Sequence, residues 1–114
     1  MPTMTPLARR ELLPGMLDML VLKTLSVQTM HGYGIAQQLQ RLSQDVIRVE
    51  EGSLYPALQR MRQKGWIKAD WRQTPNNQRA RYYTITSAGR RELGEKENGY
   101  AELMAAVRRV MRPA

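Results

Sequence analysis

The segment from Ser53 to Arg91 constrains the fold of this chain more than any other. It contains a helical pattern, a glycine, and two runs of alternating apolar residues joined by a polar turn. It also carries nine basic side chains against one acidic side chain, and this difference equals the formal net charge of +8 for all 114 residues. Charge gathered in one third of a small protein is typical of a surface that binds a polyanion. The basic residues are Arg60, Arg62, Lys64, Lys68, Arg72, Arg79, Arg81, Arg90 and Arg91.

The helix of this segment is bounded by two residues with special backbones. Pro56 has no N–H group and is expected in the first turn, which predicts a helix start near Gly52 or Ser53. Gly65 suits the left-handed position that follows a helix ending near Lys64. The inward stripe of this helix comprises Leu54, Ala57, Leu58 and Met61.

Two antiparallel strands are predicted after this helix, over residues 66–73 and 79–86. The residues between them, 74–78, include a proline and two asparagines and predict a turn. The resulting hairpin is polar at its tip and basic at its flanks. Its apolar face comprises Ile67, Ala69, Trp71, Tyr83 and Ile85.

The chain before this segment predicts two helices and a short strand. A helix over Pro14–Ser26 is apolar on most sides, so it requires several neighbours. A second helix over His31–Leu42 has a narrow inward stripe. Residues 45–49 alternate and predict a very short strand, and residues 1–10 are expected to form a flexible arm.

Gly32 and Gly34 flank Tyr33 at the start of the second helix. Glycine lets another group approach the backbone closely, and the free N–H groups at a helix start favour an anion such as phosphate. Simple capping with a tight helix–helix contact explains the same two glycines equally well.

A long final helix is predicted from Thr86 or Ser87 to Met111. Gly94 and Gly99 each cost about 1 kcal/mol relative to alanine, so the helix either continues or bends there. A three-helix core cannot easily cover this helix along its length, so we expect its apolar stripe to bind a second copy; folding back onto its own core is the alternative. The predicted dimer-interface residues are Leu93, Tyr100, Leu103, Met104, Val107, Val110 and Met111.

Composition excludes several classes of protein. The absence of cysteine excludes disulfides, thiolate nucleophiles and thiolate metal sites. His31 is the single histidine; it is expected to cap a helix or to neighbour a phosphate, and it cannot form a metal centre alone. No catalytic cluster or glycine-rich phosphate loop is recognisable, so we expect neither an enzyme nor a cofactor. No apolar run approaches the roughly 20 residues that span a bilayer, and no signal core is present, which favours a cytoplasmic protein without membrane contact.

The predicted order of elements is that of a winged helix-turn-helix, a mainly α fold of the α+β class. We expect a DNA-binding domain over residues 11–86 and a C-terminal dimerisation helix over residues 87–114. The third helix fits the major groove of DNA, and the hairpin forms a wing that reaches an adjacent groove or the backbone.

Four stretches resemble the PadR family of bacterial transcriptional regulators: LLPGMLDMLVLKTLS, HGYGI, EEGSLYPALQRMRQKGWI and RARYYTITSAGRREL. The resemblance extends from about Leu12 to Leu93, and the short final helix is similar to that of the compact subgroup. It implies a dimeric repressor whose subunits pair through the first and last helices.

The resemblance also implies which residues bind DNA. Tyr33 matches a phosphate contact, and Arg79 and Arg81 match the basic positions of the wing. Gln59 and Arg60 lie on the outward face of the third helix, where such side chains bond base edges. The wing tip is more polar than in many relatives, which argues against insertion into the minor groove. The expected DNA-binding residues are Tyr33, Ser53, Tyr55, Pro56, Gln59, Arg60, Lys64, Arg79 and Arg81.

The sequence thus predicts a regulator that binds double-stranded DNA specifically, as a dimeric repressor of a pseudo-palindromic operator. Two alternatives stay open: a winged-helix module for protein–protein contact, and a non-specific nucleic-acid binder. No pattern in the sequence identifies an operator or a small-molecule effector.

Overall fold

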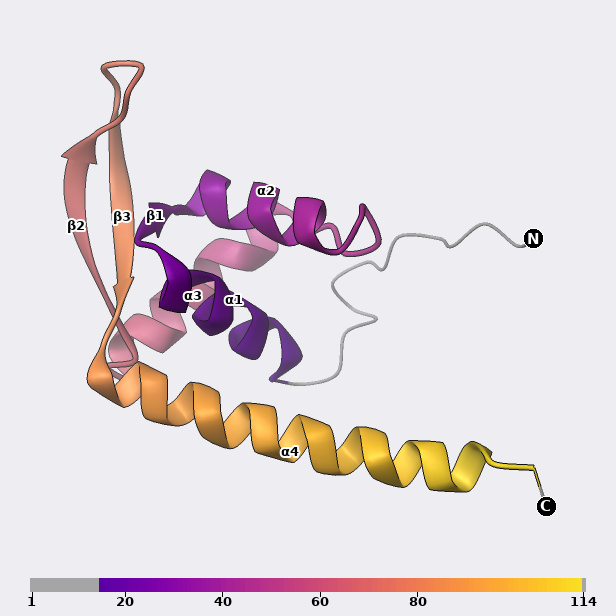
Figure 1. Cartoon of the computed structure of the whole chain (residues 1–114). Helices are drawn as coiled ribbons and strands as arrows, with labels where there is room; N and C mark the ends of the chain where they lie inside the picture. The colour runs from indigo at the N-terminus through magenta and orange to yellow at the C-terminus, as the bar shows by residue number, and fades with distance from the viewer. Residues whose placement is uncertain (1–14, 114) are drawn as a thin grey trace.

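The computed structural model describes residues 15–113 of the chain. It consists of helices and a three-stranded antiparallel sheet (Figure 1), which confirms the predicted winged α+β fold with its C-terminal helix. The predicted arm over residues 1–10 and the predicted helix start at Pro14 lie outside the described residues. The elements are α1 (Met16–Val27), β1 (Met30–His31), α2 (Gly32–Leu42), α3 (Glu51–Gln63), β2 (Ile67–Gln73), β3 (Arg79–Ile85) and α4 (Ser87–Met111).

The core lies where the first three helices meet the base of the sheet. Burying an aliphatic side chain contributes roughly 1.5–3 kcal/mol, so this cluster accounts for much of the folding free energy. The sheet contributes Ile67, Tyr83 and Ile85, and α4 contributes Leu93. The helices contribute Val21, Leu22, Leu25, Ile35, Leu39, Leu54, Ala57, Leu58 and Met61.

The sheet has the strand order β1-β3-β2. The short strand β1 lies between α1 and α2 in the chain. It joins the sheet through Met30, which pairs with Tyr83 of β3. On the other side of β3, Ile67 pairs with Ile85 and Trp71 pairs with Arg81. The first pair lies at the buried base of the hairpin, and the second lies further along the wing, which we define as β2, β3 and their connecting turn.

The strand predicted over residues 45–49 is wrong. Gln44 and Asp45 have φ angles of 53° and 69°, a left-handed backbone that interrupts an extended strand. Only Ile47 makes an isolated bridge, and Val49 (8% exposed) turns into the core. Alternation of apolar residues over so short a run therefore reflects a loop with inward contacts rather than a strand.

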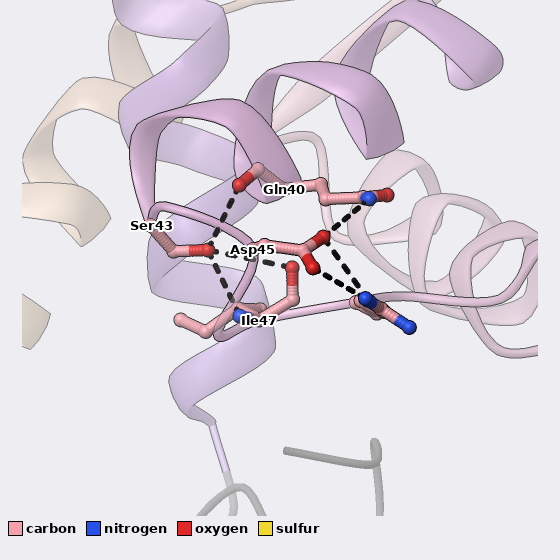
Figure 2. A network of polar contacts seen from close by, with 5 residues as sticks. Gln40, Ser43, Asp45 and Ile47 are labelled. Carbon is pink, nitrogen blue, oxygen red and sulfur yellow. Dashed lines mark hydrogen bonds and ion pairs between the residues drawn. The ribbon is translucent and has the colours of Figure 1, made fainter. Parts of the chain in front are cut away.

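Side-chain hydrogen bonds hold this α2–α3 loop in its turn (Figure 2). The hydroxyl of Ser43 accepts the Ile47 N–H at 2.9 Å. The carboxylate of Asp45 accepts the side-chain amide of Gln40 at 2.6 Å and pairs with Arg48. These bonds lower the pKa of Asp45 from its ordinary value, with the bond from Arg48 the largest cause and that from Gln40 the next.

α3 begins at Glu51, earlier than predicted, so Pro56 is its sixth residue and lies in the second turn. The expectation of a first-turn proline is therefore wrong. The end of the helix is as predicted: Gly65 has a φ of 77°. The N–H groups of Gly65 and Trp66 bond the carbonyls of Arg62 and Met61, both at 3.0 Å, which closes the helix and turns the chain into β2.

α4 is anchored at its first turn, packs along α1 and then extends past the core. The Thr86 hydroxyl accepts the Gly89 N–H at 3.0 Å, which confirms the predicted cap. A side chain at Gly89 would place its Cβ 2.0 Å from the carbonyl oxygen of Trp66. The helix continues without a break through Gly94 and Gly99 and extends past the other helices (Figure 1). Among residues 15–113, no helix is both long and apolar enough to span a membrane.

Candidate nucleic-acid interface

A groove of about 820 Å³ separates the start of α2 and one flank of α3 from the wing. Five of the nine residues predicted to bind DNA line it, and they come from all three elements. The turn of the wing, residues 74–78, closes one end of the groove with Thr74, Pro75, Asn76 and Gln78. The five predicted residues that the fold gathers here are Tyr33, Tyr55, Gln59, Arg79 and Arg81.

The start of α2 forms the first wall of the groove. His31 precedes the helix, and its Nδ1 accepts the Gly34 N–H at 3.0 Å, which confirms that this histidine caps the helix. Because Nδ1 accepts, the neutral ring carries its proton on Nε2. The ring also lies 6.4 Å from that of Tyr33, whose side chain is 56% exposed. The capping bond and the aromatic contact thus orient an exposed tyrosine at the rim of the groove.

Gly32 permits a close contact between α2 and α3. A Cβ at this position would lie 2.9 Å from the hydroxyl oxygen of Tyr55 and 2.9 Å from its ring. Of the two interpretations of this glycine, the tight helix–helix contact is therefore present. Burial raises the pKa of the Tyr55 hydroxyl, and the neighbouring Glu51 carboxylate raises it further. The hydroxyl stays protonated at neutral pH and is available to donate a hydrogen bond.

The other flank of α3 turns away from the groove and contacts α1. There, Arg60 Nη2 lies 2.5 Å from Oδ1 of Asp18. The Asp18 side chain is only 7% exposed, so the guanidinium compensates a carboxylate that is almost out of water. Arg60 does not line the groove. Its geometry is that of a link between two helices, which the sequence did not reveal because Asp18 is distant in the chain.

Ser53, Pro56 and Lys64 also lie outside the lining of the groove. Pro56 is exposed on α3, and Ser53 is partly buried near the start of this helix. The ammonium of Lys64 lies 4.7 Å from the ring centroid of Trp66, and that of Lys96 in α4 lies 5.1 Å from the same ring. Lys64 is thus placed at the joint between α3, the wing and α4.

The wing carries its charges on both faces. On the face toward the groove, the guanidinium carbons of Arg79 and Arg81 lie 5.5 and 5.7 Å from the ring centroid of Trp71. The opposite face carries Arg72, which lies 5.5 Å from the ring of Tyr82 and bonds Asp70 at 3.1 Å. The basic segment is therefore divided between faces, and the arginines of the groove are those on odd-numbered positions of β3.

Most of the predicted dimer stripe is exposed on α4. Leu93 is an exception, because it is 6% exposed and packs in the core of its own chain. Met104 is half-buried. Part of the stripe faces its own chain, because Tyr100 and Leu103 line a small hollow with Met16 and Met19 of α1. The exposed members of the stripe are Tyr100 (41%), Leu103 (45%), Val107 (42%), Val110 (81%) and Met111 (75%).

Within residues 15–113, no group of three or more histidine, cysteine, aspartate or glutamate side chains is placed to hold a metal ion. The side chains that line the groove include aromatic rings, amides and guanidinium groups. These groups suit the recognition of phosphates and nucleobases.

Comparisons with known proteins agree with this geometry. A family model described as the transcriptional regulator PadR-like family matches residues 21–95. A PadR family transcriptional regulator from Eggerthella lenta has a similar structure, with a TM-score of 0.76 and 28% identity over 88% of this chain and 85% of that one. A transcriptional regulator from Clostridium thermocellum shares the fold, with a TM-score of 0.79 and 22% identity over 86% of this chain and 95% of that one. An uncharacterised protein of Lysinibacillus sphaericus is 28% identical over 97 residues, which are 85% of this chain and 89% of that protein.

Proposed function

Because the chain belongs to the transcriptional regulator PadR-like family, whose members regulate transcription by binding DNA, we propose that it acts as a dimeric repressor of a pseudo-palindromic operator. The observation that carries this proposal is the groove between α3 and the wing. Gln59 lies on one wall of it, and Arg79 and Arg81 lie on the other. An amide suited to an adenine edge thus faces two cations suited to phosphates.

In this proposal the flank of α3 toward the wing reads the operator. Gln59 is exposed and bonds a base edge, while Tyr33 and Tyr55 donate hydroxyl hydrogen bonds to the phosphate backbone. Arg60 positions α3 against α1 through Asp18 and does not itself discriminate bases. This assignment differs from the expectation that Gln59 and Arg60 both bond base edges.

The exposed part of the α4 stripe supports pairing of two copies. Val107 and Val110 lie on one apolar stripe with Leu103 and Met111. A symmetric dimer buries the same patch of both subunits at once. It also presents two α3 helices to half-sites about one DNA turn apart, which explains why we expect a pseudo-palindromic operator.

Selection of bound sequences from random duplex DNA, followed by binding measurements, tests the proposal. We expect a selected site to bind at least about 10³-fold more tightly than bulk DNA. Gln59→Ala should relax the preference at one base position and cost about 1–3 kcal/mol. Gln63→Ala, one turn further along α3 and outside the groove, is the matched control and should bind as the unchanged chain does.

Two results would contradict the proposal. Equal binding of selected and bulk DNA would indicate a non-specific binder, and no binding to any duplex would favour a winged module for protein contact. For the repressor role, a reporter gene placed behind the selected site should be transcribed less when the protein is present. Increased transcription would instead identify an activator.

A further inference from the structure

Trp71 is exposed on a face of the sheet that is buried at its base. On the same face, Ile67 is 2% exposed, Tyr83 is 6% exposed and Ile85 is 7% exposed. Trp71 continues this alternation along β2 but is 58% exposed, because the helices end before the wing does. An indole in water forgoes a large gain from burial, so its position in the groove requires an explanation beyond the stability of the chain.

Two arginines of the neighbouring strand β3 lie beside this indole on the same face. Arg81 is the direct cross-strand partner of Trp71, and Arg79 lies two residues away on the same strand. Both guanidinium groups lie within cation–π distance of the ring, at 5.5 Å for Arg79 and 5.7 Å for Arg81. The indole therefore holds both cations in place along the wall of the groove.

Arg81 has a donor that the described residues leave unused. Its Nε is buried and has no hydrogen-bond partner within residues 15–113. A buried donor without an acceptor is costly, by about 1–3 kcal/mol. Arg81 also lines the groove, so its guanidinium lies where an anion in the groove would bind.

We propose that Trp71 is a DNA contact, in which the indole packs against a deoxyribose of the strand that lies in the groove. Arg79 and Arg81 bind the phosphates on either side of this sugar. The match is one of chemistry: the duplex backbone alternates an apolar sugar with an anionic phosphate, and the wing presents an apolar ring beside two cations. This inference rests on the proposed function, and it adds a contact that carries no base preference.

Such a contact has a characteristic effect on affinity. Each phosphate contact adds about 0.9 to the slope of log affinity against log salt concentration, whereas packing against a sugar adds nothing. Trp71→Ala should therefore weaken binding about five- to thirty-fold for operator and bulk DNA alike, mainly through packing. Trp71→Phe should restore most of the loss. Arg79→Ala should lower the slope by about one and leave base preference unchanged.

The fluorescence of single-tryptophan variants tests the contact directly. The chain has two tryptophans, so Trp66→Phe leaves only Trp71 and Trp71→Phe leaves only Trp66. Each variant is titrated with the selected duplex, and the anisotropy of labelled DNA reports binding in the same sample. We expect the emission of Trp71 to change with the midpoint of the anisotropy curve, and the emission of Trp66 to change much less.

The outcomes separate this inference from the proposed function. Binding seen by anisotropy with unchanged Trp71 emission would overturn the contact and leave the DNA-binding proposal intact. Loss of preference at one base position in Trp71→Ala would assign the indole to a base and overturn the sugar contact. No binding of the unchanged chain to any duplex would remove the proposed function itself. If Trp66→Phe does not fold, the affinities of Trp71→Ala and Trp71→Phe decide, because equal affinity to the unchanged chain excludes the contact.

Discussion

The wing and α4 both extend beyond the helical core (Figure 1). Both also expose large apolar side chains. In the wing, Trp71 lies beside two arginines on the face toward the groove. On α4, Val110 belongs to a stripe of further apolar residues at helical spacing, with Val107 one turn before it. The comparison teaches that exposure alone does not identify a partner. The neighbours of the exposed residue do, because cations favour a polyanion and an uninterrupted apolar stripe favours its own copy.

The largest effect is expected where the two regions join, at Gly89. In Gly89→Ala, the new Cβ would lie 2.0 Å from the carbonyl oxygen of Trp66, a backbone atom that cannot move aside. We expect a loss of about 3 kcal/mol or more, which lowers the Tm by roughly 10 °C or more and weakens DNA binding and dimerisation together. Thermal unfolding followed by circular dichroism measures the loss.

Gly94→Ala is the matched control for this prediction. A Cβ there has nothing within 4 Å, and alanine favours a helix interior by about 1 kcal/mol over glycine. The control should melt slightly above the unchanged chain. If Gly89→Ala also melted at or above that temperature, the close packing of α4 against the base of the wing would be wrong.

The next largest effect concerns α4 alone. Val107→Glu places a charge in the middle of the exposed stripe. We expect the affinity of the proposed dimer to fall about thirty-fold or more, since disrupting an interface hot spot costs about 2 kcal/mol or more. Sedimentation or light scattering over a range of concentrations measures the dimer. Ala101→Glu, exposed on another side of α4, should dimerise normally. If Val107→Glu dimerised as tightly as the unchanged chain, the stripe would not be the interface, and its exposure would need another explanation.

A smaller effect is expected from the flank of α3 that does not line the groove. Arg60→Ala leaves the nearly buried Asp18 carboxylate without its cation, and because Arg60 is half-exposed we expect a loss of about 1–2 kcal/mol in stability. Denaturant unfolding measures this loss. The base preference for the selected operator should be unchanged. A relaxed preference at one base position would instead indicate that Arg60 contacts a base.

The smallest effect is expected in the α2–α3 loop, which belongs to neither region. The hydrogen bonds from Arg48 and Gln40 hold the pKa of Asp45 below its ordinary value of 3.8. A lowered pKa in the folded state stabilises the protein above the unfolded pKa, and this contribution is lost as the pH falls through the folded pKa. Asp45→Asn should therefore lower the Tm slightly at pH 7, and this difference should shrink as the pH falls below 3.8 and disappear once the folded-state carboxylate is protonated. A difference that persists in strong acid would contradict this origin.

Local patterns predicted most of the elements correctly. Thr86 caps α4 and Gly65 ends α3 as expected, because each acts through bonds within a few residues of itself. The wrong predictions concern segments whose structure depends on contacts with residues distant in the sequence. Residues 45–49 alternate like a strand but do not pair with β1, β2 or β3, the strands within residues 15–113, and the edge of β3 is occupied by Met30 and His31.

The candidate site was predicted only in part, for a similar reason. Periodicity placed Gln59 and Arg60 together on the outward face of α3, yet α1 lies against one flank and the wing faces the other. Alternation assigned Trp71 to the apolar face of the hairpin without showing that the helices stop short of it. The sequence did hold a useful signal. Arg79 and Arg81 share the face of Trp71, beyond the apolar pair of Ala69 and Tyr83, which indicates that this end of the face is not buried in the core.

The amino-acid sequence by itself determined the kinds of elements, their order, and the concentration of positive charge between α3 and the start of α4, because these depend on spacing and composition. Only the tertiary structure decided which partner each side chain has. In the folded chain Arg60 pairs with Asp18, Leu93 packs in the core, and Trp71 lines the groove. The physical reason is that a repeat of 3.6 or 2 residues specifies the direction of a side chain, whereas burial depends on what another part of the chain places in that direction.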